Sequence, residues 1–214
     1  HGAWGGIYAL GTTASAIVMV WAGGLTDKFR VRTLSSAILL LLALACLFMA
    51  FNPFAVLLPL VIFALRLFGQ GMTSHIAVVA MARWFSAARG RALSISALGF
   101  SAGQAILPII FVMLLGVMDW RLLWVVAAVI AIAGIPILQR LLRKERTPQS
   151  MANENPSLGM EGRYWKRFEA LRHPLFWCMV PTVLGPSAFN TAFFFHQVHF
   201  AESKQITHIA LVAQ

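Results

Sequence analysis

The feature that most constrains this chain is a succession of apolar runs, each about 20 residues long, separated by polar segments. A helix of about 20 apolar residues crosses the hydrocarbon layer of a membrane. Such a helix also satisfies its own backbone hydrogen bonds there. The pattern therefore predicts an all-α fold, a polytopic membrane helix bundle. The expected spans are residues 2–21, 34–51, 54–82, 92–117, 122–138 and 174–199, and a truncated seventh begins after residue 205.

The amino-acid composition excludes a soluble domain. Of the 214 residues, 59% are hydrophobic and 11% are charged, whereas soluble proteins have about a quarter charged residues. A net charge of +10 would suit nucleic acid, but the basic residues form short clusters between apolar runs. We therefore expect membrane lipid, and no nucleic acid, as a partner. Cys46 and Cys178 lie inside apolar runs without ligand-like neighbours, so we expect neither a metal site nor a cofactor.

The positive charges orient the predicted spans. Nearly all Lys and Arg residues fall in the loops that follow the first, third and fifth spans; the exceptions are Arg66, Arg121 and Lys204. Because cytoplasmic loops carry the excess of Lys and Arg, we expect these three loops to be cytoplasmic. The prediction is a multi-pass protein of the plasma membrane, or of the inner membrane if the source is bacterial.

The one long polar segment follows the fifth span, at residues 141–172. Its part at 147–162 is rich in Ser, Asn, Pro and Gly, which predicts a flexible cytoplasmic linker. The part after it predicts either a short basic helix on the membrane surface or a solvated loop. The apolar residues with helical spacing there are Tyr164, Trp165, Phe168 and Leu171.

The loop after the first span, residues 23–32, resembles the signature loop of the major facilitator superfamily, Gly-x-x-x-Asp-Arg/Lys-x-Gly-Arg/Lys-Arg/Lys. Arg30 and Val31 depart from that pattern, in place of a Gly and a basic residue. In the family this loop joins helices two and three and takes part in conformational change. The matching residues are Gly23, Asp27, Lys28 and Arg32.

Later segments extend the resemblance over the whole chain. Residues 66–71 are similar to the signature of the family's fourth helix. Residues 83–91, which include Arg89, are similar to the following loop, especially in the oxalate/formate and monocarboxylate branches. The resemblance implies an incomplete chain, from helix two to the start of helix eight, that does not transport by itself and is a monomer when intact. The implied domains are a partial amino-terminal half at 1–140, the linker at 141–172, and the start of the carboxy-terminal half at 173–214.

Arg66 is the most informative candidate residue. It lies about 20 Å from Pro53 and about 25 Å from Arg83 along a helix, too deep to reach water easily. We expect it to face the central cavity and bind an anionic substrate or a coupling proton; the alternative is a structural Arg that bonds backbone carbonyls. His75 falls on the opposite face, where we expect a packing role or an interhelical hydrogen bond rather than proton coupling. The polar stripe around Arg66 consists of Arg66, Gly69, Gln70 and Thr73, at positions i, i+3, i+4 and i+7.

Two other spans contain candidate residues. The sixth span has three prolines and predicts an interrupted helix, of the kind that forms substrate sites. Asn190 and Thr191 are its candidate substrate contacts. In the fourth span, Gly99 and Gly103 predict close helix packing, and Pro108 predicts a bend useful for gating.

The resemblance implies a secondary transporter that works by alternating access. Arg66 and the branch resemblance favour a small organic anion, such as a carboxylate, exchanged or moved with protons. Drug or metabolite efflux is the alternative within transporters, and a receptor or sensor without flux is the alternative from another class. An enzyme is not expected, because the sequence contains no HExxH and no paired intramembrane carboxylates.

Overall fold

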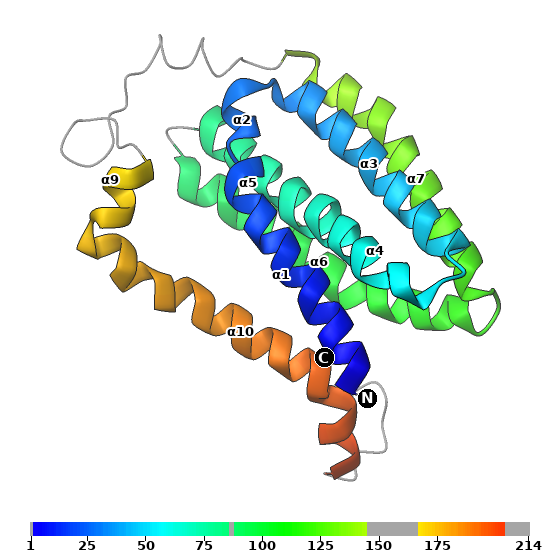
Figure 1. Ribbon diagram of the computed structural model, residues 1–214. Helices are drawn as coiled ribbons and strands as arrows, with labels where there is room; N and C mark the ends of the chain where they lie inside the picture. The colour runs from blue at the N-terminus through cyan, green and yellow to red at the C-terminus, as the bar shows by residue number, and fades with distance from the viewer. Residues whose placement is uncertain (1, 86–87, 145–166, 204–214) are drawn as a thin grey trace. The chain divides into compact units, whose positions relative to one another are not determined.

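The computed structural model describes residues 2–85, 88–144 and 167–203 (Figure 1). Every regular element in these residues is a helix. The chain divides into two compact units, His1–Glu154 and Asn155–Gln214. Each unit is considered by itself.

The first unit contains the long helices that the apolar runs predict. Five helical segments of the described chain are long and apolar enough to cross a membrane, which confirms the all-α membrane fold and the first five spans. The helices of this unit are α1 (Gly2–Ala22), α2 (Leu25–Lys28), α3 (Val31–Phe51), α4 (Leu58–Leu65), α5 (Thr73–Trp84), α6 (Arg89–Leu115) and α7 (Trp120–Leu141). Short turns of 3₁₀ helix are η1 (Ala55–Leu57) and η4 (Leu142–Lys144), and η2 (Arg66–Met72) is a π-helix.

The unit is built on two helix pairings. Helix α3 packs antiparallel against α7, and α1 packs against α4 and η2 (Figure 1). Small residues allow the first pairing, since Ala43 and Cys46 of α3 are buried beside Ala128 of α7. Such residues let helix backbones approach closely in a membrane, where packing replaces the hydrophobic effect.

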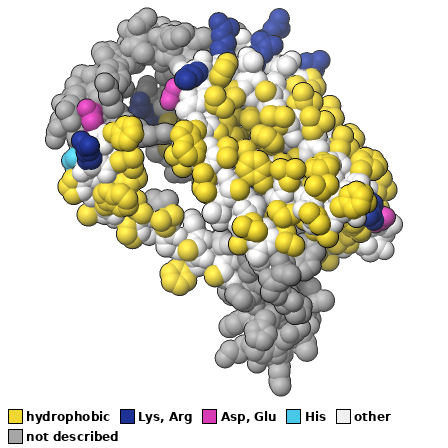
Figure 2. All heavy atoms as spheres, viewed as in Figure 1, with side chains coloured by type: hydrophobic (Ala, Val, Ile, Leu, Met, Phe, Trp, Pro, Cys, Tyr) yellow, Lys and Arg dark blue, Asp and Glu magenta, His cyan; other side chains and the backbone are white. Residues whose placement is uncertain are grey.

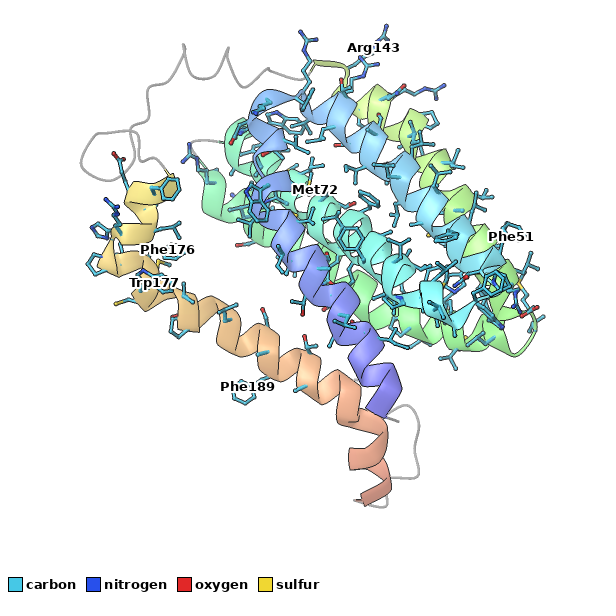
Figure 3. All side chains as sticks on the ribbon, viewed as in Figure 1. Phe51, Met72, Arg143, Phe176, Trp177 and Phe189 are labelled. Carbon is cyan, nitrogen blue, oxygen red and sulfur yellow. The ribbon has the colours of Figure 1, made fainter. Side chains whose placement is uncertain are left out.

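A second core joins α3 to α5 and η2. Its buried side chains include Ile38, Met72 and Ile76, and Met19 of α1 packs against it. Met72 is among the most deeply buried side chains of the described residues. In Figure 3 it lies in the middle of the helices.

Most of the outer surface of this unit is apolar, as lipid requires. Helix α6 has no buried residue, although Leu98, Leu107 and Met113 are large and apolar. Figure 2 shows hydrophobic side chains over much of the visible face, and Lys and Arg along the edge where α3 begins and α7 ends. This edge is the one that the charge distribution predicts to be cytoplasmic.

The second unit contains α9 (Arg167–Arg172) and α10 (Pro174–Ser203). Residues 167–172 are helical and not a loop, whereas Tyr164 and Trp165 lie outside the described residues. The sixth expected span is helical, but the predicted interruption is wrong, because α10 is continuous. A proline costs a helix one hydrogen bond and some bending, and here Pro181 and Pro186 do not end it. The seventh expected stretch lies outside the described residues.

Candidate functional site

Arg66 begins the π-helix η2, in the middle of the third span. A π-helix forms hydrogen bonds from i to i+5 and is frequently found at functional sites. The Thr73 hydroxyl donates to the Phe68 carbonyl at 2.6 Å, five residues earlier, which fits this wide turn. Because the turn is wider than an α-helix, the spacing assumed for the predicted polar stripe is wrong in this segment.

The Arg66 side chain lies against α1. Its guanidinium carbon is 4.8 Å from the centroid of the Tyr8 ring, a cation–π contact. Gly11, one turn after Tyr8, makes the approach possible. A Cβ at Gly11 would lie 2.8 Å from the Pro59 oxygen and 2.9 Å from Cγ2 of Ile62. Only glycine therefore lets α1 approach α4 closely enough for Tyr8 to reach Arg66.

The same face of α1 carries further polar groups. Tyr8, Thr12 and Ser15 recur at i, i+4 and i+7, on one side of the helix. Tyr8 meets Arg66 at one end of this face, and Met19 meets Gly71 of η2 at the other. Ser15 is buried, and the Thr12 hydroxyl is buried without a hydrogen-bond partner, alone in this among the described side chains. We call Tyr8, Thr12, Ser15 and Arg66 the α1–η2 polar seam.

The other members of the predicted stripe have different surroundings. Gln70 is exposed. Thr73 lines a crevice formed by α3, α5 and α7, and Arg66 is not among the residues that line it. Arg66 and Thr73 therefore do not share this crevice.

The candidates on α10 belong to the second unit. The Thr191 hydroxyl donates to the Ser187 carbonyl at 2.8 Å, within its own helix. The side chain of Asn190 lies outside the description. Substrate contact by Asn190 and Thr191 stays a prediction.

The loop after α1 is held by an arginine from the end of α5. Arg83 Nη2 lies 2.5 Å from Asp27 Oδ1, and Arg83 Nη1 donates to the Thr26 carbonyl at 2.7 Å. The side chain of Arg83 is 25% exposed and that of Asp27 is 71% exposed. The pair joins α2 to α5 and gives Asp27 a cationic partner from another helix.

Gly23 is a second residue of this loop that hydrogen bonds hold in place. Its carbonyl accepts from the Thr26 hydroxyl at 2.8 Å and from His75 Nε2 at 3.2 Å. The second bond requires a proton on Nε2, because a carbonyl only accepts. It matches the interhelical hydrogen bond predicted for His75. A Cβ at Gly23 would lie 3.4 Å from His75 Nε2 and 3.3 Å from the Met19 oxygen, so the close fit favours glycine.

The remaining motif residues are at the surface of the first unit. Lys28 ends α2, Arg32 lies in the first turn of α3, and Arg89 begins α6; all three are exposed. A Cβ at Gly99 of α6 would meet nothing within 4 Å, and one at Gly103 would meet only Leu107 of the same helix at 3.9 Å. The packing and gating roles of Gly99, Gly103 and Pro108 stay predictions.

Sequence reasoning missed several residues of these sites. Tyr8, Thr12 and Ser15 could have been found from the polar periodicity within the first span. The pairing of Arg83 with Asp27 joins residues 56 positions apart, and no local pattern marks it.

Comparison with known proteins places the chain in a family. A family model described as Major Facilitator Superfamily matches residues 2–213. No curated protein and no solved structure matches the chain significantly. The match covers nearly the whole sequence and agrees with the membrane-spanning helices, but it does not separate one branch of the family from another. The chain belongs to the Major Facilitator Superfamily and is a multi-pass membrane protein of a transporter family.

Proposed function

We propose that this protein transports a small organic anion, such as a mono- or dicarboxylate, by alternating access, with Arg66 as the anion site. Helix α1, helix α3, the segment from α4 to α5, and helices α6 and α7 then correspond to helices two to six of the family fold. The basic edge of the unit is cytoplasmic in this proposal, and the membrane is the plasma membrane. Transport proceeds by exchange or together with protons.

The observation that carries the proposal is the lack of an acidic partner for Arg66. The one acidic residue in the five spanning segments of the first unit is Asp27, at the end of the first segment, and it pairs with Arg83, so Arg66 has no carboxylate counter-ion in these segments. An unpaired charge at this depth costs several kcal/mol or more unless it faces a cavity or a partner. A substrate carboxylate would supply the missing charge, and a guanidinium can bind it through two parallel hydrogen bonds.

The α1–η2 polar seam supports a binding role. The Tyr8 ring covers one side of the Arg66 guanidinium. The N–H groups of the guanidinium that the ring does not cover are then available to bind an anion. The Thr12 hydroxyl adds a buried donor without a partner in the described protein. Buried polar groups normally have partners, and a bound substrate oxygen would provide one.

The test is uptake of labelled small carboxylates into vesicles that contain the protein expressed from its complete reading frame. Arg66→Ala should reduce uptake more than tenfold while the protein remains folded and inserted. Arg121→Ala is the matched control, because Arg121 also lies over an aromatic ring, that of Trp120 at 4.5 Å, but at an exposed helix start. This control should retain uptake.

Other outcomes would redirect the proposal. Uptake that survives Arg66→Ala would make this arginine structural. An intact protein that moves no carboxylate but exports amphiphilic cations would be an efflux transporter. Saturable binding without flux would indicate a receptor or sensor.

A further inference from the structure

A basic hollow lies where α3 begins and α7 ends. Arg30, Arg32 and Arg143 line it together with three neutral polar side chains, Thr33, Ser36 and Gln139, and its volume is about 320 Å³. Among the residues that the structure describes, no acidic side chain lines it. Figure 3 shows Arg143 at this end of the two helices. Three guanidinium groups around one cavity favour an anionic group with several oxygen acceptors, such as a phosphate.

Hydrogen bonds among the residues of the hollow connect the two helices. Gln139 Nε2 donates to the Ser36 hydroxyl at 3.4 Å, and the Ser36 hydroxyl donates to the Arg32 carbonyl at 2.9 Å. These bonds connect α7 to the first turns of α3. The positive end of the α3 dipole and the negative end of the α7 dipole both lie here and oppose each other, so the three guanidinium groups supply the attraction for an anion.

An apolar crevice of about 330 Å³ runs along α3, α5 and α7 beside this hollow. Its polar members are Ser35 and Thr73, and both hydroxyls are used within their own helices. Ser35 donates to the Val31 carbonyl at 2.6 Å, and Thr73 donates to the Phe68 carbonyl at 2.6 Å. A ligand in the crevice would therefore contact aliphatic and aromatic side chains.

The hollow and the crevice meet at one residue, because Leu142 lines both. The hollow lies at the basic edge, whereas the crevice lies between membrane-spanning helices. A soluble phosphate would fill the hollow alone, and an apolar molecule would fill the crevice alone. A ligand that fills both carries an anionic group on an apolar chain.

We propose that an anionic phospholipid binds here, with its phosphate among Arg30, Arg32 and Arg143 and an acyl chain in the crevice. The charge distribution predicts that this edge is cytoplasmic, and the cytoplasmic leaflet supplies anionic lipids. An acyl chain gains little by moving from the bilayer into the crevice, because both are apolar. The headgroup therefore determines selectivity, and the crevice determines where the chain lies.

The experiment measures how much phospholipid the purified full chain retains in detergent, by mass spectrometry of the intact complex. The probes are phosphatidylglycerol and phosphatidylcholine with identical acyl chains. A basic residue near a membrane surface strengthens anionic-lipid binding about fivefold, so the double variant Arg30→Gln/Arg143→Gln should weaken phosphatidylglycerol retention about thirtyfold. Arg89→Gln/Arg91→Gln removes two exposed cations elsewhere and should change retention less than twofold.

A second pair of variants tests the crevice. Ala77 and the adjacent Val78 of α5 are both exposed, but only Ala77 lines the crevice. Ala77→Phe should fill the crevice and lower phosphatidylglycerol retention at least fivefold, and Val78→Phe should not. Glycerol 3-phosphate, which has the phosphate but no acyl chain, should fail to displace the lipid.

Four results would overturn the proposal. Equal retention of the two phospholipids would leave no role for the hollow. An equal loss in both arginine double variants would show attraction to surface charge in general. Displacement by glycerol 3-phosphate, or no effect of Ala77→Phe, would make the hollow a site for a soluble phosphate.

Discussion

Arg83 at the end of α5 forms an ion pair with Asp27 at 2.5 Å and also donates to the adjacent Thr26 carbonyl at 2.7 Å. One side chain thus holds both the acid and the backbone of the loop between α1 and α3. Asp27 lies in the loop that resembles the family's signature loop, and its partner comes from another helix. The ion pair with Arg83 gives a physical reason for the presence of Asp27 in an otherwise basic loop.

A double-mutant cycle on Asp27→Asn and Arg83→Gln should measure this pair. Because Asp27 is 71% exposed, we expect a coupling of about 0.5 kcal/mol, within the range of exposed ion pairs. The measurement is thermal unfolding in detergent, and the coupling should shrink in 1 M salt. Asp27→Asn combined with Arg91→Gln is the control cycle and should show none. Equal coupling in both cycles would mean that Asp27 responds only to the general positive field.

Gly11→Ala should destabilise the protein by about 1–3 kcal/mol, the usual cost of overpacking. The added Cβ would lie 2.8 Å from the Pro59 backbone oxygen, which cannot move without shifting α4. Gly6→Ala in the same helix is the control, because its Cβ would meet nothing within 4 Å. That change should stabilise the helix by about 0.5–1 kcal/mol. Unfolding temperatures that fall equally in the two variants would rule out the close contact as the cause.

The sequence predicts the spans of the first unit well, because lipid makes length and hydropathy decisive. For example, the apolar run at 34–51 becomes helix Val31–Phe51. The sequence does not predict the π-helix at Arg66, since that turn depends on how Gly69 and Gly71 fit against α3 and α1. Periodicity calculated for an α-helix therefore placed Thr73 beside Arg66, where the structure separates them. Contacts across helices, such as Arg66 on Tyr8, depend on tertiary packing that no local pattern contains.

Thr12→Val should stabilise the protein by about 1 kcal/mol. The Thr12 hydroxyl is buried without a partner, and replacing an unsatisfied polar group with an isosteric apolar one recovers its desolvation cost. Thr13→Val is the matched control at the next, exposed position and should have little effect. The measurement is thermal unfolding without substrate. A loss of stability in Thr12→Val would show that the hydroxyl already has a partner in the protein.

Tyr8→Leu should raise the KM for a transported carboxylate about fivefold. It removes the ring that positions Arg66, and a cation–π contact contributes about 1 kcal/mol. Tyr8→Phe retains a ring and should stay closer to the native value. Trp120→Leu removes the ring beside Arg121 and serves as the control. If Trp120→Leu raised the KM as much as Tyr8→Leu does, positioning of Arg66 could not explain the change.

The last prediction concerns the two donors to the Gly23 carbonyl. Thr26→Val and His75→Phe each remove one donor and leave the other, so each should cost about 1 kcal/mol. The double variant leaves the carbonyl without either donor, and its cost should exceed the sum of the single costs by about 1 kcal/mol. Thermal unfolding of all three variants measures this excess. Thr26→Val with Ser94→Ala, whose hydroxyl bonds Gly90 instead, is the control and should be additive. Additivity in the Thr26 and His75 pair would mean that the carbonyl finds another donor, such as water, once both are gone.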